Sequence, residues 1–391
     1  MTHHLTRRKL LERGVLGGAA IAFPSIAAAC GGTSGKSAGS TAAGKQQLAK
    51  TLHFSNWTLY IDTKGQAHPS LDEFQKKYGT HVDYVEDIND NASFFGKIQG
   101  QLRRGQSVGR DIIVMTDNSR YPSLLVRKGW VEKLDKSALP NIKNLVPLQR
   151  HPAWDPNRDY SLPWQSGMTG IAYNDTLTGP VLSIDDLFGN PKLKGKITVL
   201  NEMADAMSLV MLSNGDDPAK VTDQTFNKAL AKIKKAVDSG QIRQFTGNDY
   251  APPLAKGDLA AAMSWSGDIA QLGNKNIHWN LATDGGDTWT DNMLIPTGGN
   301  AYTASVYMNY VYDPKVQALM VAGDPKKKIV GIYYIPPVVG AKAEALKINP
   351  SVANNPLIFP TQKELDNLHL FDPLALNNPK YLTAWQNLIS G

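Results

Sequence analysis

The sequence predicts an α/β protein with two lobes, and three observations lead to this fold class. The chain has 391 residues, and because a single hydrophobic core stops growing at roughly 250 to 300 residues, two lobes are expected. From residue 51 onward, stretches with strand patterns alternate with stretches with helix patterns, which predicts a parallel or mixed sheet with helices on both faces. A hydrophobic content of 42% and a charged content of 19% are typical of a folded globular chain.

The first 50 residues predict an export signal, over residues 1–29, and a tether. Arg7 and Arg8 belong to a twin-arginine pattern, and residues 14–29 form an apolar stretch too short for a transmembrane helix. Residues 27–31 resemble a lipoprotein signal-peptidase box, in which Cys30 is lipidated; ordinary cleavage after the alanine run is the alternative. Cys30 is the only cysteine, so no intrachain disulfide can form. Residues 30–50 have the composition of a flexible tether, which would hold the protein at the outer face of a membrane.

The basic charge of the chain does not predict nucleic-acid binding. The formal net charge is +6 and the isoelectric point is about 9.1. Residues 1–29 contain four basic side chains and one acidic side chain, so half of the net charge lies in the export signal. The other basic residues are scattered and have no interleaved aromatics, unlike the basic patches that bind nucleic acids.

The first predicted lobe begins with the stretch 51–60. Leu52 and Phe54 alternate with polar residues as in a half-buried strand, and Trp57 and Tyr60 follow at its C-terminal edge. Ligands of open α/β sheets bind outside the carboxyl ends of the strands, so these two rings can form one wall of a site. The next predicted elements are a helix over 71–78 with Ser70 as N-cap and Gly79 as stop, strands over 81–85 and 111–115, helices over 92–104 and 121–128, and an edge segment over 130–134.

A proline-rich stretch separates the two predicted lobes. Four prolines lie between residues 147 and 163, and because proline fixes φ and removes a donor, this stretch predicts a hinge or lobe boundary. Beyond it, strands are predicted over 164–174, 196–200, 259–264 and 290–296, and helices over 208–212, 225–239 and 302–310. The segment from Lys326 onward predicts helices that pack on the second lobe. Lobe 1 is expected to comprise residues 51–163 and 270–320, and lobe 2 residues 164–269 and 321–391.

Aromatic and acidic side chains recur at the predicted strand ends. They are Trp57, Tyr60, Glu202, Asp205, Trp265, Asp268, Trp289 and Asp291, and the loop residues Asp249, Tyr250, Tyr333 and Tyr334 can join them. Carboxylates hold ammonium groups by charge-assisted hydrogen bonds, and ring faces attract cations and cover methylene chains. A cleft that carries both kinds of side chain predicts a flexible diamine or triamine as its ligand.

The chain resembles the spermidine/putrescine-binding proteins of polyamine ABC transporters in four segments that keep their order. These segments are residues 56–60, 132–136, 155–164 and 265–268. The resemblance runs from about residue 51 to the C-terminus. It implies a type II periplasmic-binding-protein fold, in which two α/β lobes close on spermidine or putrescine and deliver it to a membrane permease. It also implies an exported monomer without catalytic residues, cofactor or metal.

The resemblance assigns roles to individual residues. Trp57 and Tyr60 match the first aromatic pair of the family, and Trp265 and Asp268 match its tryptophan and its acidic ammonium ligand. Trp289 stands where an aromatic wall residue is expected before the strand 292–295. The whole expected ligand-binding set is Trp57, Tyr60, Glu202, Asp205, Tyr250, Trp265, Asp268, Trp289 and Asp291.

The chain departs from the family pattern in three places. The acidic pair after the strand 196–200 is displaced by about a residue, as Glu202 and Asp205. After the strand 111–115, where relatives often have tyrosine, this chain has Asp117, Asn118 and Ser119. The loop between residues 60 and 71 is longer than expected. These departures leave the length and charge of the ligand open.

Other readings of these residues stay open at this point. Glu202 and Asp205 can equally be acids in the first turn of a helix, where they stabilise the helix dipole by about 0.3–1 kcal/mol. Tyr333 and Tyr334 can be ferric-ion ligands or core residues. A hydrolase with paired carboxylates is possible, but Ser266 lies in no Gly-x-Ser-x-Gly motif and the histidines have no metal-ligand spacing. Amino-acid and sugar receptors share the expected fold.

Overall fold

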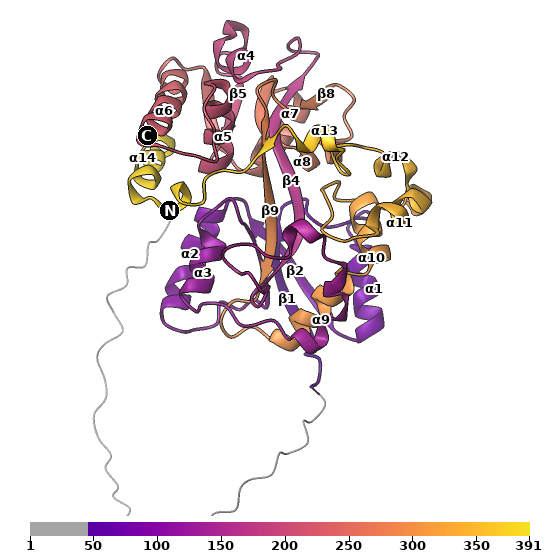
Figure 1. The fold of residues 1–391 in the computed structure, drawn as a ribbon. Coiled ribbons are helices and arrows are strands. Elements are labelled where there is room, and N and C mark those ends of the chain that lie inside the picture. Colours follow the sequence, from indigo (N-terminus) through magenta and orange to yellow (C-terminus); the bar gives the residue numbers. More distant parts are fainter. Residues whose placement is uncertain (1–45) are drawn as a thin grey trace, which may run out of the picture. The chain divides into compact units, whose positions relative to one another are not determined.

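The structure, a computed structural model, describes residues 46–391, which form one compact unit (Figure 1). The predicted export signal, Cys30 and most of the predicted tether lie outside the described residues. The last tether residues already belong to the folded body, because the backbone N–H of Ala49 donates to Thr303 Oγ1 over 2.9 Å and Lys50 O accepts from His81 N. Among residues 46–391, no helix combines the length and apolarity needed to cross a bilayer.

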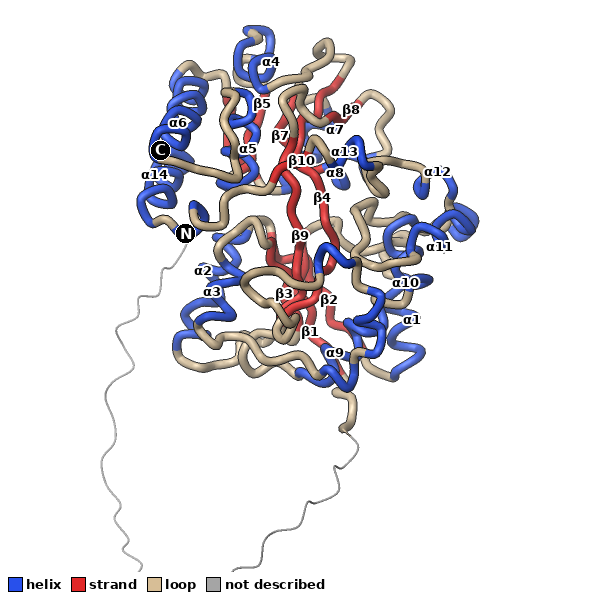
Figure 2. The backbone as a smooth tube through the Cα atoms, in the orientation of Figure 1, coloured by secondary structure: helices blue, strands red, loops and turns tan. Residues whose placement is uncertain are grey.

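Within residues 46–391, ten strands form one mixed sheet, in the order β2-β1-β3-β9-β4-β7-β5-β6, with β10 beside β9 and β8 beside β4. Figure 2 shows the strands in red. Strand β4 pairs with β9 along its first half and with β7 and β8 along its second half, so β4 and β9 connect the group β1–β3 to the group β5–β7. The strands are β1 (Thr51–Trp57), β2 (His81–Ile88), β3 (Ile112–Thr116), β4 (Ser161–Asn174), β5 (Ile197–Leu200), β6 (Ile242–Thr246), β7 (Ala261–Trp265), β8 (Ile277–Asn280), β9 (Gly286–Leu294) and β10 (Leu368–His369).

The sequence prediction of the two connecting strands is wrong at the start of β4 and at both ends of β9, which ends at Leu294 instead of residue 296. Strand β4 begins three residues before the predicted start at Trp164, and Pro163 lies inside it, where the register with β9 shifts. A proline lacks the donor that a central strand needs, and a bulge accommodates it. Strand β9 begins at Gly286 instead of residue 290, so Trp289 and Asp291 lie within this strand and not at its edge. Strands β6, β8 and β10 were not predicted.

Helices α1, α2, α3, α9 and α10 surround the group β1–β3 (Figure 1). Asp90 begins α2 by accepting from Ser93 N over 2.7 Å, and Phe94, Ile98 and Leu102 are buried on one face. The predicted N-cap role of Ser70 is wrong, since Ser70 lies inside α1 and its hydroxyl donates to the Asp62 carboxylate. These helices are α1 (Pro69–Tyr78), α2 (Asn91–Arg103), α3 (Tyr121–Arg127), α9 (Ala301–Val311) and α10 (Pro314–Ala322).

Six helices accompany the group β5–β7. Thr222 begins α6 with a capping box, and the ring of Phe226 on its buried face stacks on Tyr381 of α14 at 4.1 Å. These helices are α4 (Ile184–Gly189), α5 (Met203–Ser213), α6 (Asp223–Asp238), α7 (Ala251–Lys256), α8 (Ser266–Leu272) and α14 (Pro379–Ser390).

The segment after Lys326 divides between the two strand groups. Helix α14 packs on α6, but α11 (Ala341–Ile348) packs on α10, which itself contacts α1 and α9. The expectation that the whole segment packs on the second lobe is therefore wrong for α11. The remaining short elements are α12 (Pro350–Ala353), α13 (Gln362–Leu365) and the 3-10 helices η1 (Lys136–Ala138), η2 (Pro140–Asn144), η3 (Pro147–Gln149), η4 (Pro191–Leu193), η5 (Asn248–Tyr250), η6 (Pro325–Lys327) and η7 (Ala375–Asn377).

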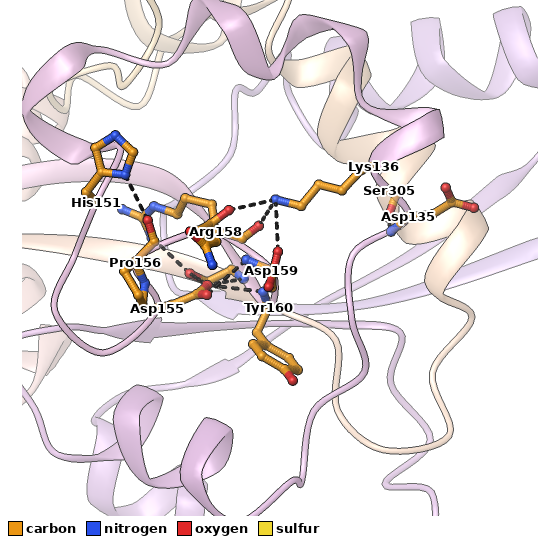
Figure 3. A network of polar contacts seen from close by, with 11 residues as sticks. Asp135, Lys136, His151, Asp155, Pro156, Arg158, Asp159, Tyr160 and Ser305 are labelled. Carbon is orange, nitrogen blue, oxygen red and sulfur yellow. Dashed lines mark hydrogen bonds and ion pairs between the residues drawn. The ribbon is translucent and has the colours of Figure 1, made fainter.

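A dense polar network holds the segment that leads into β4 (Figure 3). The Asp155 carboxylate accepts from the backbone N–H groups of Asp159, Tyr160 and Ser161. The buried guanidinium of Arg158 donates to Gln149 O, Ser161 Oγ and Asn292 Oδ1. Lys136 Nζ donates to Asn157 O over 2.9 Å and lies 3.7 Å from the Asp159 carboxylate. We call these side chains, Lys136, Asp155, Arg158 and Asp159, the strand-entry network.

Candidate functional site

A pocket with about 330 Å³ of empty space, part of which is open to solvent, lies where β1 and β7 end and against the middle of β9. It contains eight of the nine predicted ligand-binding residues; Tyr250 is the exception. Residues from both strand groups contribute to its lining, which is Trp57, Thr58, Tyr60, Thr116, Asn118, Glu202, Asp205, Asn248, Trp265, Asp268, Trp289, Asp291 and Tyr334.

Five aromatic rings form a continuous wall of this pocket. Trp57 and Trp265 are the last residues of β1 and β7, as predicted, and their rings meet edge to face with centroids 5.8 Å apart. The Trp289 ring lies 6.2 Å from Trp265 and 5.7 Å from Tyr334, and the Tyr334 ring lies 4.8 Å from Tyr60. Such a wall presents ring faces and edges to any ligand that enters.

Two features of the backbone near this wall are unusual: two glycines approach its rings closely, and two other residues have a left-handed conformation. A Cβ atom added at Gly167 would collide with the Trp289 ring, and one added at Gly267 would collide with the Tyr334 ring. Each pocket tyrosine also follows a residue with left-handed backbone, since Leu59 has φ 60° and Tyr333 has φ 54°. Residues other than glycine rarely adopt this region and then often mark functional sites.

Asp268 accepts three hydrogen bonds from side chains at the pocket. Its carboxylate is 1% exposed and accepts from Asn248 Nδ2 at 2.8 Å, from Tyr250 OH at 2.7 Å and from Tyr334 OH at 2.6 Å. Burial raises the pKa of Asp268, and the three donors act in the opposite direction. Tyr250 lies behind Asp268, where its OH also accepts from Trp265 N, so the structure gives Tyr250 a supporting position instead of a place in the lining.

Asp205 and Asp287 form a second acidic group. Asp205 accepts from Thr169 Oγ1, from Trp265 Nε1 at 2.9 Å and from Asn118 Nδ2 at 2.9 Å. Although Asp205 does lie in the first turn of α5, its side chain is therefore committed to the pocket. Asp287 is fully buried and accepts from Ser208 Oγ at 2.9 Å and from the same Asn118 nitrogen at 3.3 Å. Burial raises the pKa of both carboxyl groups.

Glu202 connects the two strand groups. It precedes α5 but makes no side-chain capping bond there. Instead, its Oε1 accepts from the backbone N–H of Asn91 at 2.7 Å and from Asn91 Nδ2 at 2.8 Å, at the start of α2. Burial, followed by the charge of Asp90, raises the pKa of Glu202 to about 8.

Asp291 has the fewest partners of the pocket acids. Along β9, Asp287, Trp289 and Asp291 alternate with residues of the opposite face, so all three side chains point to the same side of the sheet. Asp291 Oδ2 accepts from Tyr60 OH at 2.7 Å, while Oδ1 is buried and has no hydrogen-bond partner among the described residues. Burial raises the pKa of Asp291 to about 7.

The polar groups of the pocket are unbalanced in charge and in hydrogen bonding. Four carboxyl groups line it, but no lysine, arginine or histidine of residues 46–391 belongs to its lining. Three buried oxygens also lack a hydrogen-bond partner within the described chain: Asp291 Oδ1, Asn118 Oδ1 and Asn248 Oδ1. Because buried carboxylates without a cation are costly, and because all three unpartnered atoms are acceptors, the pocket is suited to a ligand with several N–H donors and positive charge.

Five lining residues were not predicted as ligand-binding: Thr58, Thr116, Asn118, Asn248 and Tyr334. The sequence marks Asn118 only as a departure from the family pattern, and Tyr334 only as one of two adjacent tyrosines. The side chains of the two tyrosines do not meet at one site, because Tyr333 packs in a separate hydrophobic cluster that includes Ile332 and Phe359.

Within residues 46–391, the other candidate residues do not form a metal site. Asp249 is exposed, and its carboxylate accepts a hydrogen bond from Gly247 N. In the described part of the chain, no group of three His, Cys, Asp or Glu side chains is arranged to hold a metal ion.

Comparisons with known proteins agree on the family. A model of bacterial extracellular solute-binding proteins matches residues 70–358. Spermidine/putrescine-binding periplasmic protein 1 of Haemophilus influenzae is 26% identical over 337 residues, covering 85% of this chain and 88% of that protein. Putrescine-binding periplasmic protein PotF of Escherichia coli is 30% identical over 295 residues, covering 69% of this chain and 75% of that protein.

A solved structure confirms the predicted fold class. The structure of a putative spermidine/putrescine ABC transporter from Listeria monocytogenes is similar with a TM-score of 0.72 and 23% identity, covering 88% of this chain and 98% of that one. The fold is thus that of the two-lobed periplasmic solute-binding proteins, with strands β4 and β9 joining the two strand groups. The chain belongs to the bacterial extracellular solute-binding protein family.

Proposed function

We propose that this protein is the substrate-binding component of an ABC importer and captures a polyamine, spermidine or putrescine, in the pocket described above. The observation that carries this proposal is the set of four carboxyl groups, Glu202, Asp205, Asp268 and Asp291, in a lining without basic side chains from residues 46–391. The names of the relatives from Haemophilus influenzae and Escherichia coli support the same ligand class. No catalytic step is proposed.

The expected contacts follow from the chemistry of the lining. Ligand ammonium groups donate charge-assisted hydrogen bonds to the carboxylates. The rings of Trp57, Tyr60, Trp265 and Trp289 cover the methylene chain and attract the cations, and a cation over a ring contributes about 0.5–2 kcal/mol. Tyr250 supports this site indirectly, because its hydroxyl holds Asp268.

Capture is proposed to proceed by closure of the two lobes around the ligand. The proposed lobe 1 comprises residues 51–163 and 270–320, and the proposed lobe 2 comprises residues 164–269 and 321–391 apart from α11, with the hinge near 147–163. Two contacts beside the pocket join residues of these lobes: Asn91 with Glu202, and Asn118 Nδ2 with Asp205 Oδ2 at 2.9 Å. The ligand can favour the closed state only by its differential affinity for closed over open, and the permease is proposed to recognise that state.

Other ligand classes fit the lining less well. An amino acid would bring a carboxylate into a lining that offers no basic side chain of the described residues. A neutral sugar would leave the four acids uncompensated, and a ferric ion would find only one of the adjacent tyrosines, Tyr334, at the pocket. A hydrolase would consume its ligand, so recovery of unchanged polyamine after incubation distinguishes a receptor from an enzyme.

The location of the protein is part of the proposal. The family consists of extracellular solute-binding proteins, and the relatives named above are periplasmic. We propose export through the signal of residues 1–29, lipidation at Cys30, and a monomer held at the outer face of the cytoplasmic membrane. Mass spectrometry of the membrane fraction would detect a diacylglyceryl group on Cys30, and an unmodified N-terminus after the alanine run would contradict it.

The proposed function is tested by isothermal titration of protein freed of bound ligand. Putrescine, spermidine and spermine are titrated separately at low and high ionic strength. Saturable one-to-one binding that weakens with salt is expected, because salt screens the attraction between ammonium and carboxylate groups. Absence of binding by folded, ligand-free protein would contradict the proposed ligand class.

A further inference from the structure

The side-chain amide of Asn118 is held in one orientation at the pocket. Asn118 lies in the loop that follows β3, and its Nδ2 donates to Asp205 Oδ2 at 2.9 Å and to Asp287 Oδ2 at 3.3 Å. Its Oδ1 is buried and accepts no hydrogen bond from the described residues. The residue is 7% exposed and belongs to the pocket lining.

Simple electrostatics explains why this orientation is kept. A primary amide carries two donors on its nitrogen and only acceptors on its oxygen. If the amide were turned over, Oδ1 would face Asp205 Oδ2 and Asp287 Oδ2, and both carboxyl oxygens would lose the donor that Asn118 now supplies. The two acids therefore direct the nitrogen toward themselves and leave the oxygen as a free acceptor at the pocket.

Asp287 has no direct access to the pocket. It is fully buried and absent from the lining, and its other oxygen, Oδ1, accepts from Ser208 Oγ at 2.9 Å. Apart from Ser208, the hydrogen-bond donor that it meets in the described chain is Asn118. The hydrogen-bonded connection from Asp287 to the pocket lining therefore runs through the Asn118 amide.

The same arrangement occurs at Asn248, another residue of the pocket lining. Asn248 Nδ2 donates to Asp268 Oδ2 at 2.8 Å, and Asn248 Oδ1 is likewise buried without a partner in the described residues. Asn248 is also 7% exposed and lines the pocket. Two asparagines, each with its nitrogen on a carboxylate, thus leave a carbonyl oxygen for a ligand.

We propose that Asn118 Oδ1 is a ligand contact that accepts an N–H of the cationic ligand, and that Asp287 is a positioning residue that fixes the Asn118 amide. This inference rests on the proposed function, because it requires a ligand with N–H donors. It adds to the pocket an uncharged acceptor that discriminates by the direction of the ligand N–H and not only by charge.

A double-mutant cycle with spermidine as the probe tests both roles. Spermidine affinity is measured by titration calorimetry for the wild type, Asn118→Ala, Asp287→Asn and the double variant. Asn118→Ala is expected to weaken binding about 10-fold or more, the equivalent of one hydrogen bond to a charged group. Asp287→Asn is expected to weaken binding less, and the double variant to bind no more weakly than Asn118→Ala alone.

Ser208→Ala is the matched control. It removes a hydrogen bond from the same Asp287 carboxylate but leaves the contact with Asn118. Its affinity for spermidine is expected to stay within about 2-fold of the wild type, since the ligand contacts are unchanged. If Asn118→Ala does not fold, as judged by circular dichroism, Asn118→Ser takes its place, because the shorter hydroxyl cannot reach both carboxylates.

Each outcome of the cycle has a distinct meaning. If the wild type binds none of the polyamines, the proposed function fails. If the wild type binds spermidine and Asn118→Ala binds it equally well, Asn118 is not a ligand contact and the inference fails. If the losses from the two single variants add in the double variant, Asp287 acts independently of Asn118, and its positioning role is contradicted.

Discussion

Two polar clusters of this protein differ in how many hydrogen-bond partners the protein supplies to their buried charged groups. In the strand-entry network, the Asp155 carboxylate receives four hydrogen bonds from the protein and the Arg158 guanidinium has three acceptors within reach. In the pocket, Asp291 has one donor, and its second oxygen has none within the described chain. Both clusters contain buried charged groups, but only in the strand-entry network do residues of the protein supply all the hydrogen-bond partners that these groups need.

This difference separates structural from ligand-binding polar groups. A buried charged group that is fully paired maintains the fold, and removing one partner leaves the other uncompensated. A buried acid without a cation raises the free energy of the ligand-free protein, and the missing partner can come from a ligand. Substitutions in the network should therefore affect stability, and substitutions in the pocket should affect affinity.

The largest effect is expected in the network, for Arg158→Met. This change keeps an unbranched apolar stem but leaves Gln149 O, Ser161 Oγ and Asn292 Oδ1 without their donor. The free energy of unfolding should fall by about 3 kcal/mol or more, which urea denaturation measures. Arg150→Met, in the same segment but exposed, should cost about 1 kcal/mol or less. Equal losses for both would mean that the network does not stabilise the fold.

For Asp268→Asn in the pocket, the affinity for the ligand is expected to fall while the stability of the fold is kept. Spermidine binding should weaken by about 1.5–3 kcal/mol, the range for hydrogen bonds to charged groups, as measured by calorimetry. The unfolding free energy of the ligand-free variant should change by less than about 1 kcal/mol, because the substitution removes an uncompensated buried charge along with part of its hydrogen bonding. Asp155→Asn is the matched acid of the network and should lower stability while affinity is kept. Unchanged affinity for Asp268→Asn would remove this residue from the site.

The pH dependence of binding should distinguish the two clusters further. Burial raises the pKa of Glu202 to about 8 and that of Asp291 to about 7, above the ordinary values of 4.5 and 3.8. The folded protein then holds more protons than the unfolded one in this window, so the stability of the ligand-free protein falls as the pH rises from about 4 to 8. A cationic ligand favours the ionised acids, so affinity should rise over the same window and binding should release protons.

Calorimetry in buffers of different ionisation enthalpy measures this proton release. Glu202→Gln should reduce the number of protons released near neutral pH. Binding of spermidine without any proton exchange between pH about 5 and 8 would contradict the raised pKa values of the pocket acids.

The smallest effect is expected for Trp265→Phe. The substitution keeps an aromatic face at the pocket but removes the N–H that donates to Asp205 at 2.9 Å. Affinity for spermidine should fall by about 1 kcal/mol, the net value of one hydrogen bond together with the weaker attraction of phenylalanine for cations. Trp279→Phe is the control, because Trp279 donates to Ser264 O outside the lining. Equal affinities for both variants would make Trp265 a packing residue.

Local patterns in the sequence were sufficient to predict part of the site. Trp57 follows a stretch in which Leu52 and Phe54 alternate with polar residues, and Trp265 follows a mostly apolar run, so their places at the ends of β1 and β7 follow from the strand patterns. Trp289 and Asp291 were correct as lining residues, but their position was wrong. Strand β9 begins at Gly286, and its pocket face carries Asp287, Trp289 and Asp291, which conceals the usual apolar alternation.

The rest of the site depends on contacts between distant parts of the chain. Asn118 and Asn248 are single polar residues in loop and 3-10 segments, and nothing in their neighbourhoods marks them as facing acids that lie 87 and 20 residues away. Tyr334 reaches Asp268, 66 residues earlier, through a left-handed turn at Tyr333 that the sequence does not reveal. Tyr250 was predicted near the site because of its position in the chain, but only the tertiary structure shows that it lies behind Asp268.

The acids of the pocket have no positively charged side chain beside them in the lining formed by residues 46–391, and we propose that the ligand supplies this charge. The most direct test compares putrescine with 1,4-butanediol, which has the same carbon chain but uncharged ends, by titration calorimetry on ligand-free protein. Putrescine is expected to bind in a saturable one-to-one manner, and 1,4-butanediol is expected to show no measurable binding under the same conditions. Equal binding of the two compounds would contradict the claim, because the positive charge would then make no contribution.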